Sequence, residues 1–233
     1  MDARHVAWAA GLFDAEGSVY TWPQRAGLRR EMAVSQGGDG AVPDVLLRFR
    51  DAVGGHGRIR GPVRGYLYYW YAGRQDVIDS VSASLWPWLA REKRAQFERA
   101  AVAMGRDTPR DVARQRCSRF EPAELAWAAG FFEGEGTVAL NGSAPRLWLP
   151  QASAQGIPEV LARFQAAVGG LGSISGPYVL KNPWSKLPQY RWGLSRFEHV
   201  QAVIAMFWPW MSARRRSGAR AVLLRQRATG GPP

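Results

Sequence analysis

Two segments decide the fold: AWAAGLFDAEGSV at residues 7–19 and AWAAGFFEGEGTV at residues 126–138, which are identical at 9 of 13 positions. The duplication extends further, because VLLRFRDAVGGHGRIRGP at 45–62 matches VLARFQAAVGGLGSISGP at 160–177 at 12 of 18 positions. The order of the matching segments is kept, and only the spacing between them changes. This pattern indicates that one folding unit occurs twice in the chain.

The two copies are predicted at residues 1–104 and 121–233, joined by a polar, arginine-rich linker at 105–120. Two copies of about a hundred residues are typical of a pair of domains with pseudo-twofold symmetry, rather than of a solenoid. Such a pair matches the pseudo-dyad of a DNA duplex.

The spacing of apolar residues predicts the same elements in both copies, in the order αββαββα followed by a further helix. We therefore expect an α+β fold with antiparallel sheets. The expected helices are 3–15, 43–53, 75–85, 88–104, 122–134, 157–168, 197–207 and 211–228, and the expected strands are 18–25, 28–36, 57–63, 66–73, 137–141, 146–151, 172–179 and 188–194.

The composition favours a nucleic-acid partner. Lys and Arg number 31 against 19 Asp and Glu, a net charge of +12, and such an excess suits a polyanion because bound phosphates release counterions. A basic protein without this function would show the same charge. The single cysteine excludes an internal disulfide and fits an intracellular setting. No stretch of the sequence is expected to span a membrane, and no secretory signal is expected in residues 1–17.

The repeated motif helices carry small residues on one face, at Ala7, Ala10 and Gly11 in the first copy. If the two copies pack through these faces, Glu16 and Glu135 come together at the helix ends. Two adjacent carboxylates repel each other unless a cation binds both, and their oxygens select hard ions such as Mg²⁺. The alternative is that these carboxylates only solvate helix ends. Their recurrence in register favours the metal site.

The first acidic residue of each motif is interpreted differently. Asp14 and Glu133 lie on the same helical face as the small residues. For these two residues a structural, hydrogen-bonding role is expected rather than metal binding. The recurring tryptophans, among them the Trp-Pro-Trp segments near 86–88 and 208–210, are expected mainly in the core.

Both acidic segments resemble the motif of the LAGLIDADG homing endonucleases, and the resemblance extends over nearly the whole chain. It includes a glutamine after the second strand of each copy, the Gly-Gly-x-Gly-x-Ile segment, and the Pro-aromatic pairs Pro87-Trp88 and Pro209-Trp210. The resemblance implies a pseudo-dimer whose motif helices form the interface and whose two antiparallel sheets form a saddle over the DNA major groove.

The resemblance also implies the catalytic residues. The final acidic residue of each motif would bind divalent metal, Mg²⁺ or another hard cation such as Mn²⁺ or Ca²⁺, although many members have Asp where this chain has Glu. The family often has basic residues near the scissile phosphates, and the basic residues of this chain align with them only if one residue is inserted. The implied metal ligands are Glu16, Glu135 and the carbonyls of Ala15 and Gly134, and the implied supporting residues are Gln36, Gln151, Lys93 and Arg215.

Alternating residues on the strands are expected to contact DNA, because a β-ribbon fits the major groove and arginine bonds to guanine there. A bulge would invert the alternation. Serines replace Arg58 and Arg60 in the second copy, which predicts an asymmetric target. The expected contacts are Tyr20, Trp22, Gln24, Arg29, Arg58, Arg60, Arg64, Tyr69 and Tyr71, and Asn141, Arg146, Trp148, Ser173, Ser175, Lys181, Lys186 and Arg191.

The resemblance predicts a monomeric, intron-encoded enzyme that cuts both strands of a long duplex target and leaves short 3′ overhangs. A non-cleaving DNA-binding protein or an RNA maturase on the same fold is the alternative. The presence of both acidic residues favours the enzyme, because degenerate relatives of this kind usually lose them. The chain lacks splicing residues at its ends, so we expect a free-standing protein rather than an intein-embedded nuclease.

Overall fold

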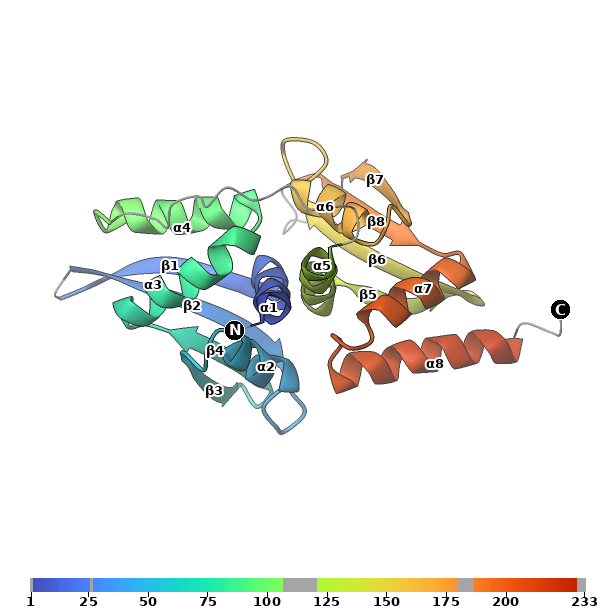
Figure 1. Cartoon of the computed structure of the whole chain (residues 1–233), viewed down its shortest axis with the longest axis horizontal. Helices are drawn as coiled ribbons and strands as arrows, with labels where there is room; N and C mark the ends of the chain where they lie inside the picture. The colour runs from blue at the N-terminus through green and yellow to red at the C-terminus, as the bar shows by residue number, and fades with distance from the viewer. Residues whose placement is uncertain (1, 26, 107–120, 180–186, 230–233) are drawn as a thin grey trace. The chain divides into compact units, whose positions relative to one another are not determined.

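The computed structural model describes residues 2–25, 27–106, 121–179 and 187–229, with side chains up to residue 225. The chain divides into two compact units, Met1–Cys117 and Ser118–Pro233, called unit 1 and unit 2 below (Figure 1). The boundary between the units falls inside the segment expected as a linker, most of which lies outside the described residues. The expected DNA contacts Lys181 and Lys186 also lie outside them.

Unit 1 follows the element order expected from its sequence. Its helices are α1 (Ala3–Glu16), α2 (Asp44–Ala52), α3 (Gln75–Leu85) and α4 (Arg91–Ala103), with a short 3₁₀ helix at Trp86–Trp88. Its strands are β1 (Gly17–Gln24), β2 (Gly27–Gly37), β3 (Arg58–Val63) and β4 (Leu67–Ala72). The last helix begins three residues later than expected, because Leu89 and Ala90 have extended backbone.

Unit 2 repeats this order. Its helices are α5 (Pro122–Glu135), α6 (Glu159–Ala167), α7 (Phe197–Phe207) and α8 (Ala213–Thr229). Its strands are β5 (Thr137–Asn141), β6 (Ala144–Ala152), β7 (Ser173–Tyr178) and β8 (Gln189–Leu194). The expected duplication and the α+β class are therefore confirmed within each unit.

Each unit contains one four-stranded antiparallel sheet. The strand order is β1-β2-β4-β3 in unit 1 and β5-β6-β8-β7 in unit 2. The registers also agree: Tyr20 is paired with Glu31 as Ala139 is with Arg146, and the second hairpin of each unit has a register shift after its third pair. Because the pairings correspond, a residue of one sheet has a defined equivalent in the other.

The two faces of each sheet have different surroundings. In β2, Arg30, Met32 and Val34 are buried and alternate with half-exposed neighbours, and β6 has the same alternation at Pro145, Leu147 and Leu149. The buried side is the one against which the helices of the unit pack, as the contacts of α1, α2 and α3 with β2 show. We call this side the inner face and the opposite side the outer face.

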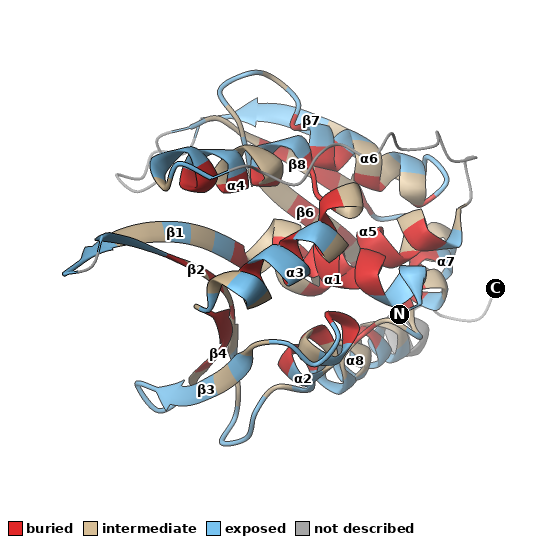
Figure 2. Ribbon diagram, turned by 60° about the vertical axis from the view of Figure 1, so that its left-hand side comes forward, coloured by how far each residue is buried: buried red, intermediate tan, exposed pale blue. Residues whose placement is uncertain are grey.

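The motif helices α1 and α5 begin with different devices. The Asp2 side chain accepts a hydrogen bond from the Arg4 amide at 2.9 Å and so caps α1, whereas α5 begins with Pro122, which needs no helical donor at that position. In α1 every residue of Val6–Phe13 is buried, whereas a surface helix buries only the residues of one face (Figure 2).

Both motif helices end at a glycine that packing requires. A Cβ atom on Gly17 would lie 2.4 Å from the Phe13 carbonyl oxygen and 2.4 Å from the Phe13 ring. A Cβ on Gly136 would lie 2.3 Å from the Phe132 ring. The requirement is steric, since both glycines have ordinary extended backbone with φ of −73° and −72°.

Aromatic side chains form the core of each unit. In unit 1, Phe49 stacks on Phe13 at 6.2 Å and meets the edge of Trp70 at 4.9 Å, and the corresponding rings of unit 2 repeat the cluster. Trp8, Trp70, Trp127 and Trp192 are fully buried, as predicted. The prediction was wrong for Trp88, Trp208 and Trp210, which are half-buried because the short turn before the last helix lies at the surface.

Candidate functional site

Glu16 and Glu135 are the last residues of α1 and α5, and both are half-exposed. The last turn of each helix contains no basic residue. The carbonyls of that turn, which include those of Ala15 and Gly134, have no partner inside the helix and give its end a partial negative charge. Each helix end therefore presents oxygen ligands of the kind that hard divalent cations prefer.

In the part of the chain that the structure describes, no group of three or more His, Cys, Asp or Glu side chains is arranged to hold a metal. One carboxylate per unit with neighbouring carbonyls is a sparser ligand set. Such a set is typical of Mg²⁺, which keeps several water ligands and uses one or two protein carboxylates.

Asp14 and Glu133 each connect the motif helix to the last helix of their own unit. Both Asp14 carboxylate oxygens accept hydrogen bonds from the Ala90 amide at 3.0 Å, and Ala90 is the N-cap residue of α4. Glu133 Oε2 accepts a hydrogen bond from the Ser212 amide at 3.1 Å, immediately before α8. The expected hydrogen-bonding role is confirmed, since each carboxylate satisfies a donor at a helix N-terminus.

Lys93 and Arg215, the expected basic residues, lie at the motif ends. Lys93 is buried in the first turn of α4, and its Nζ donates to the Gly17 carbonyl at 2.5 Å. Arg215 occupies the same position in α8 and donates to the Gly136 and Glu133 carbonyls. The two residues are structural equivalents, as aligned. Their bonds fix the carbonyl of the glycine that follows each motif glutamate, and contact with a phosphate stays a prediction.

Gln36 and Gln151 are equivalent residues near the ends of β2 and β6, where they are half-exposed. They are paired in register with Tyr68 and Tyr190 of the neighbouring strands. By alternation along the strands, both glutamines lie on the inner face, whereas the expected DNA contacts on the same strands lie on the outer face. Their placement at a strand end leaves them accessible.

The outer face of unit 1 is rich in arginine and aromatic side chains. It includes a groove of about 580 Å³. The Arg60 guanidinium lies 4.4 Å from the Tyr71 ring centroid, and Arg29 lies 5.9 Å from that of Trp22. Arg64 lies in the exposed turn between β3 and β4, with φ of 52°. The predicted contacts that line the groove are Trp22, Arg29, Arg58, Arg60, Tyr69 and Tyr71.

Tyr20 and Glu31, neighbours across β1 and β2, form a hydrogen bond on this outer face. The Tyr20 hydroxyl donates to Glu31 Oε1 at 2.9 Å. Burial, and then the bond to Glu31, raises the pKa of Tyr20 to about 12, so the hydroxyl remains a donor at neutral pH. Tyr20 was among the expected DNA contacts. Period-two alternation from Arg29 places Glu31 on this face, but only the register reveals its partner.

The outer face of unit 2 has a different chemistry. Arg146 lies 5.7 Å from the Trp148 ring centroid, and Arg191 lies 5.2 Å from that of Tyr178. Ser173 and Ser175 are exposed on β7, and Asn141 is exposed at the end of β5. Pairing of Ser175 with Arg191 corresponds to pairing of Arg60 with Tyr69 in unit 1. The expected contacts described in both units thus share one side of each sheet, apart from those in turns.

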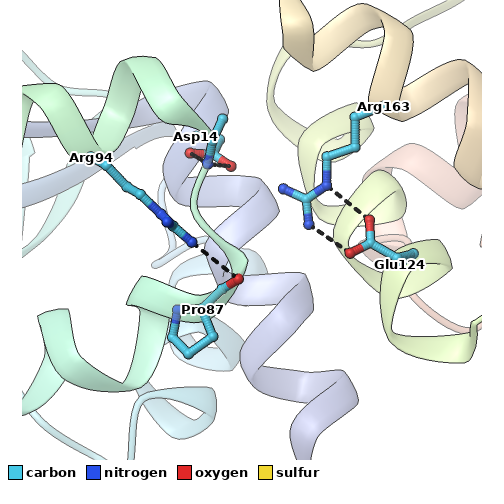
Figure 3. A network of polar contacts seen from close by, with 6 residues as sticks. Asp14, Pro87, Arg94, Glu124 and Arg163 are labelled. Atoms are coloured by element: carbon cyan, nitrogen blue, oxygen red, sulfur yellow. Dashed lines mark hydrogen bonds and ion pairs between the residues drawn. The ribbon is translucent and has the colours of Figure 1, made fainter. Parts of the chain in front are cut away.

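An ion pair connects α6 to the motif helix α5 in unit 2. Arg163 of α6 donates to both carboxylate oxygens of Glu124, at 2.8 and 3.0 Å (Figure 3). Its guanidinium lies 3.6 Å from the Trp127 ring centroid. In unit 1, Arg48 lies 4.4 Å from the Trp8 ring centroid, while His5 occupies the position of Glu124. The sequence comparison did not single out this difference, which is structural rather than catalytic.

Comparison with known proteins gives two kinds of result. The sequence matches no family profile and no curated protein. Solved structures do match over both units. The LAGLIDADG meganuclease I-AabMI, bound to uncleaved DNA, matches with a TM-score of 0.67 and 13% identity, covering 98% of this chain and 92% of that one.

Two further endonucleases match in the same way. I-GzeII, a LAGLIDADG homing endonuclease in complex with its DNA target, has a TM-score of 0.58 and 13% identity over 96% of this chain and 92% of that one. I-SmaMI, bound to an uncleaved DNA target in the presence of calcium ions, has a TM-score of 0.55 and 14% identity over 97% of this chain and 94% of that one.

Among the described residues, no helix combines the length and the apolar composition that a membrane span requires.

These likenesses cover nearly the entire chain and agree with the repeated element order of units 1 and 2. At such low identity they establish the architecture and not the activity. The resemblance inferred from the twin motifs is therefore confirmed at the level of the fold: the chain has the fold of the single-chain LAGLIDADG homing endonucleases.

Proposed function

We propose that the protein is a site-specific DNA endonuclease that hydrolyses one phosphodiester bond in each strand of a duplex with the help of divalent metal. The observation that carries this proposal is the repeated helix end. In a chain with the fold of DNA endonucleases, each unit ends its motif helix on a half-exposed glutamate, Glu16 or Glu135, followed by a glycine that no other residue can replace without a clash.

The residues at the motif ends fit a hard divalent cation. Glu16 and Glu135, with the carbonyls of Ala15 and Gly134, would hold Mg²⁺, or Mn²⁺ or Ca²⁺ in its place. The structure of I-SmaMI with calcium ions and uncleaved DNA supports divalent-cation use in this fold. When bound, the ion would stabilise negative charge on the phosphate and lower the pKa of a coordinated water.

The other residues at the motif ends are assigned supporting roles. Gln36 and Gln151 would orient water through their amide groups. Lys93 and Arg215 are positioning residues in this proposal, because each donates to the carbonyl after the motif glutamate and thereby fixes the backbone that presents it. Their positive charge also lies next to the glutamates, where a phosphate would be attracted.

The outer faces are proposed to hold the DNA. Arginine guanidinium groups of both sheets would contact phosphates and base edges, and the aromatic rings would support them. The units differ at equivalent positions, which supports an asymmetric target. A single chain with two units would act as a monomer on a long site and leave short 3′ overhangs, as the resemblance implies. An intracellular, intron-encoded setting belongs to the same proposal.

The decisive experiment is cleavage of a target selected from a randomised duplex library, with Mg²⁺, by the parent chain and by Glu16→Gln and Glu135→Gln. Each substitution keeps the size of the side chain and removes its charge. We expect double-strand cleavage to fall more than about 100-fold, because even the partners of metal ligands are worth 10–100-fold. DNA binding measured with Ca²⁺ in place of Mg²⁺ should persist.

The matched control is Glu98→Gln, the same change at an exposed position on α4. It should leave cleavage unchanged. Parental cleavage by both motif variants would show that the assigned residues are not the site. A chain that binds its selected DNA but never cuts it with Mg²⁺, Mn²⁺ or Ca²⁺ would favour the alternative, a DNA-binding protein on this fold. Selective binding of structured RNA instead would favour a maturase.

A further inference from the structure

One position has opposite charge in the two units. Glu31 of β2 and Arg146 of β6 are equivalent, because each faces the same residue of the preceding strand, Tyr20 or Ala139. Both side chains are half-exposed and lie on the outer face. Both belong to an inner strand, flanked on each side by another strand. The inversion therefore lies within the sheet and not at its rim.

The structure gives neither side chain an ionic partner. Among the described residues, Glu31 has no cation within ion-pair distance, and its hydrogen bond comes from the neutral Tyr20 hydroxyl. Arg146 likewise has no carboxylate partner in the described ranges and lies beside the Trp148 ring. Both charges are thus available to an external ligand.

The Tyr20 hydroxyl makes Glu31 a directed acceptor. It bonds to Oε1 at 2.9 Å, which restrains the carboxylate and leaves Oε2 for another donor. A carboxylate is unsuited to phosphate, because like charges repel. Arg29, Arg58 and Arg60 supply the positive charge around it in the same groove. The ligand that suits Glu31 is an amino group held next to a phosphate backbone, as on the edge of a base.

Base edges in the major groove distinguish the two side chains. A glutamate accepts a hydrogen bond from the cytosine N4 amino group, and an arginine donates two bonds to guanine O6 and N7. A target with perfect twofold symmetry would place the same base at equivalent positions of its two halves. Residues of opposite charge at these positions select different bases.

Resting on the DNA-binding function proposed above, we propose that Glu31 and Arg146 are specificity-determining residues at equivalent positions of the two half-sites. Glu31 selects cytosine, and Arg146 selects guanine, each on the strand that its own sheet contacts. This pair is a point at which the target departs from twofold symmetry.

The test is selection of bound duplexes from a randomised library by the full chain and by Glu31→Gln and Arg146→Gln. Glutamine pairs with adenine N6 and N7. We expect each variant to change one position, cytosine to adenine for Glu31→Gln and guanine to adenine for Arg146→Gln. The preference for the original base should fall about 5- to 150-fold, which corresponds to the usual discrimination of one such contact.

A second variant, Glu31→Arg, makes the equivalent positions alike. It should convert the cytosine preference to guanine and bring the two half-sites closer to symmetry. Glu98→Gln on α4 is the matched control for loss of a negative charge, and it should select the parental sequence. Unfolding midpoints of all variants, compared with the parent, report whether the chain still folds.

The outcomes separate the two proposals. If the parent selects no sequence, the proposed function fails. If the parent selects a target and Glu31→Gln, Glu31→Arg and Arg146→Gln keep the same base at every position, the specificity assignment is wrong even though the protein binds DNA. A uniform rise in affinity for all sequences in Glu31→Gln, without a changed base, also overturns it, because that result reports net charge alone.

Discussion

In unit 1 the carboxylate that anchors the last helix belongs to Asp14 and the cation at the motif end is Lys93, whereas in unit 2 they are Glu133 and Arg215. Each pair makes the same two connections with different side chains. The broader guanidinium of Arg215 also donates to the backbone carbonyl of Glu133. The repeated feature is therefore the contact with the backbone, and either pair of side chains satisfies it.

The outer faces differ more deeply. Ala33 is paired with Tyr71 in unit 1, while Trp148 is paired with Gly193 in unit 2, so the large side chain moves to the other strand. Arginines lie on the edge strand β3 in unit 1, at Arg58 and Arg60, and serines replace them on β7. Packing thus constrains the inner face of both units in the same way, while the outer face is free to match different ligands.

The largest effect is expected at the glycines after the motifs. Gly17→Ala places a methyl group against the ring and the backbone oxygen of Phe13, and Gly136→Ala places one against the Phe132 ring. Overpacking typically costs 1–3 kcal/mol, so we expect about 3 kcal/mol for each substitution. Urea unfolding of the full chain measures both. Equal midpoints for the parent and the Gly17→Ala variant would contradict the close approach.

The next largest loss of stability is expected at Asp14 and Glu133, which accept hydrogen bonds from the amides before α4 and α8. Asp14→Ala removes the acceptor for the Ala90 amide, and α4 has no side-chain cap of its own. In α8 the Ser212 hydroxyl also accepts a hydrogen bond, from the Arg215 amide at 3.2 Å. Loss of a cap costs roughly 0.5–2 kcal/mol, so we expect Asp14→Ala near the upper end and Glu133→Ala near the lower end.

The same unfolding measurement tests this ranking of the anchors. Asp14→Asn and Glu133→Gln, which keep an acceptor oxygen, serve as controls and should lose less stability than the alanine variants. A greater loss in Glu133→Ala than in Asp14→Ala would show that the second cap in α8 contributes little.

A smaller effect on stability is expected from a difference in sequence between α8 and α4. Gly218 of α8 is exposed, and a Cβ there would have nothing within 4 Å; its equivalent in α4 is Gln96. Glycine in a helix interior is less stable than alanine by roughly 0.5–1 kcal/mol. We expect Gly218→Ala to stabilise unit 2 by about that amount and Gln96→Gly to destabilise unit 1 similarly. An unchanged midpoint in Gly218→Ala would indicate a frayed α8.

The helices and strands could be predicted from the sequence because the same pattern of buried residues occurs in both units. Alternating apolar residues such as Met32 and Val34 recur at Leu147 and Leu149, and the duplicated pattern reinforces each element. The start of α4 was less predictable. Its position depends on the extended backbone of Leu89 and Ala90, which follows from the bond between Ala90 and Asp14, a residue 76 positions away.

The candidate site was predictable in part for the same reason. Lys93 could be aligned, but its burial and its bond to Gly17 depend on the packing of α4 against β1. The partnership of Tyr20 with Glu31 depends on the strand register, which alternation alone does not give. The catalytic roles of Glu16 and Glu135 came from the resemblance and stay predictions.

The smallest effect concerns Tyr20, whose counterpart in unit 2 is Ala139. Burial, together with the bond to Glu31, raises its pKa from 10.0 to about 12, so the folded state favours the neutral phenol. The resulting stabilisation is complete below about pH 10 and is lost as the pH rises through about 12. Because the ring is 41% exposed, the gain in stability is slight.

Alkaline titration of the phenolate absorbance of the folded chain can detect Tyr20 without relying on stability. The step near pH 12 should disappear in Tyr20→Phe and move to lower pH in Glu31→Gln, because the neutral amide no longer repels the phenolate. Substitution of a tyrosine on the same outer face, Tyr69→Phe, should leave that step in place. If Glu31→Gln leaves the step where it was, the carboxylate does not hold the Tyr20 hydroxyl, and unit 1 lacks the directed acceptor that distinguishes its outer face from that of unit 2.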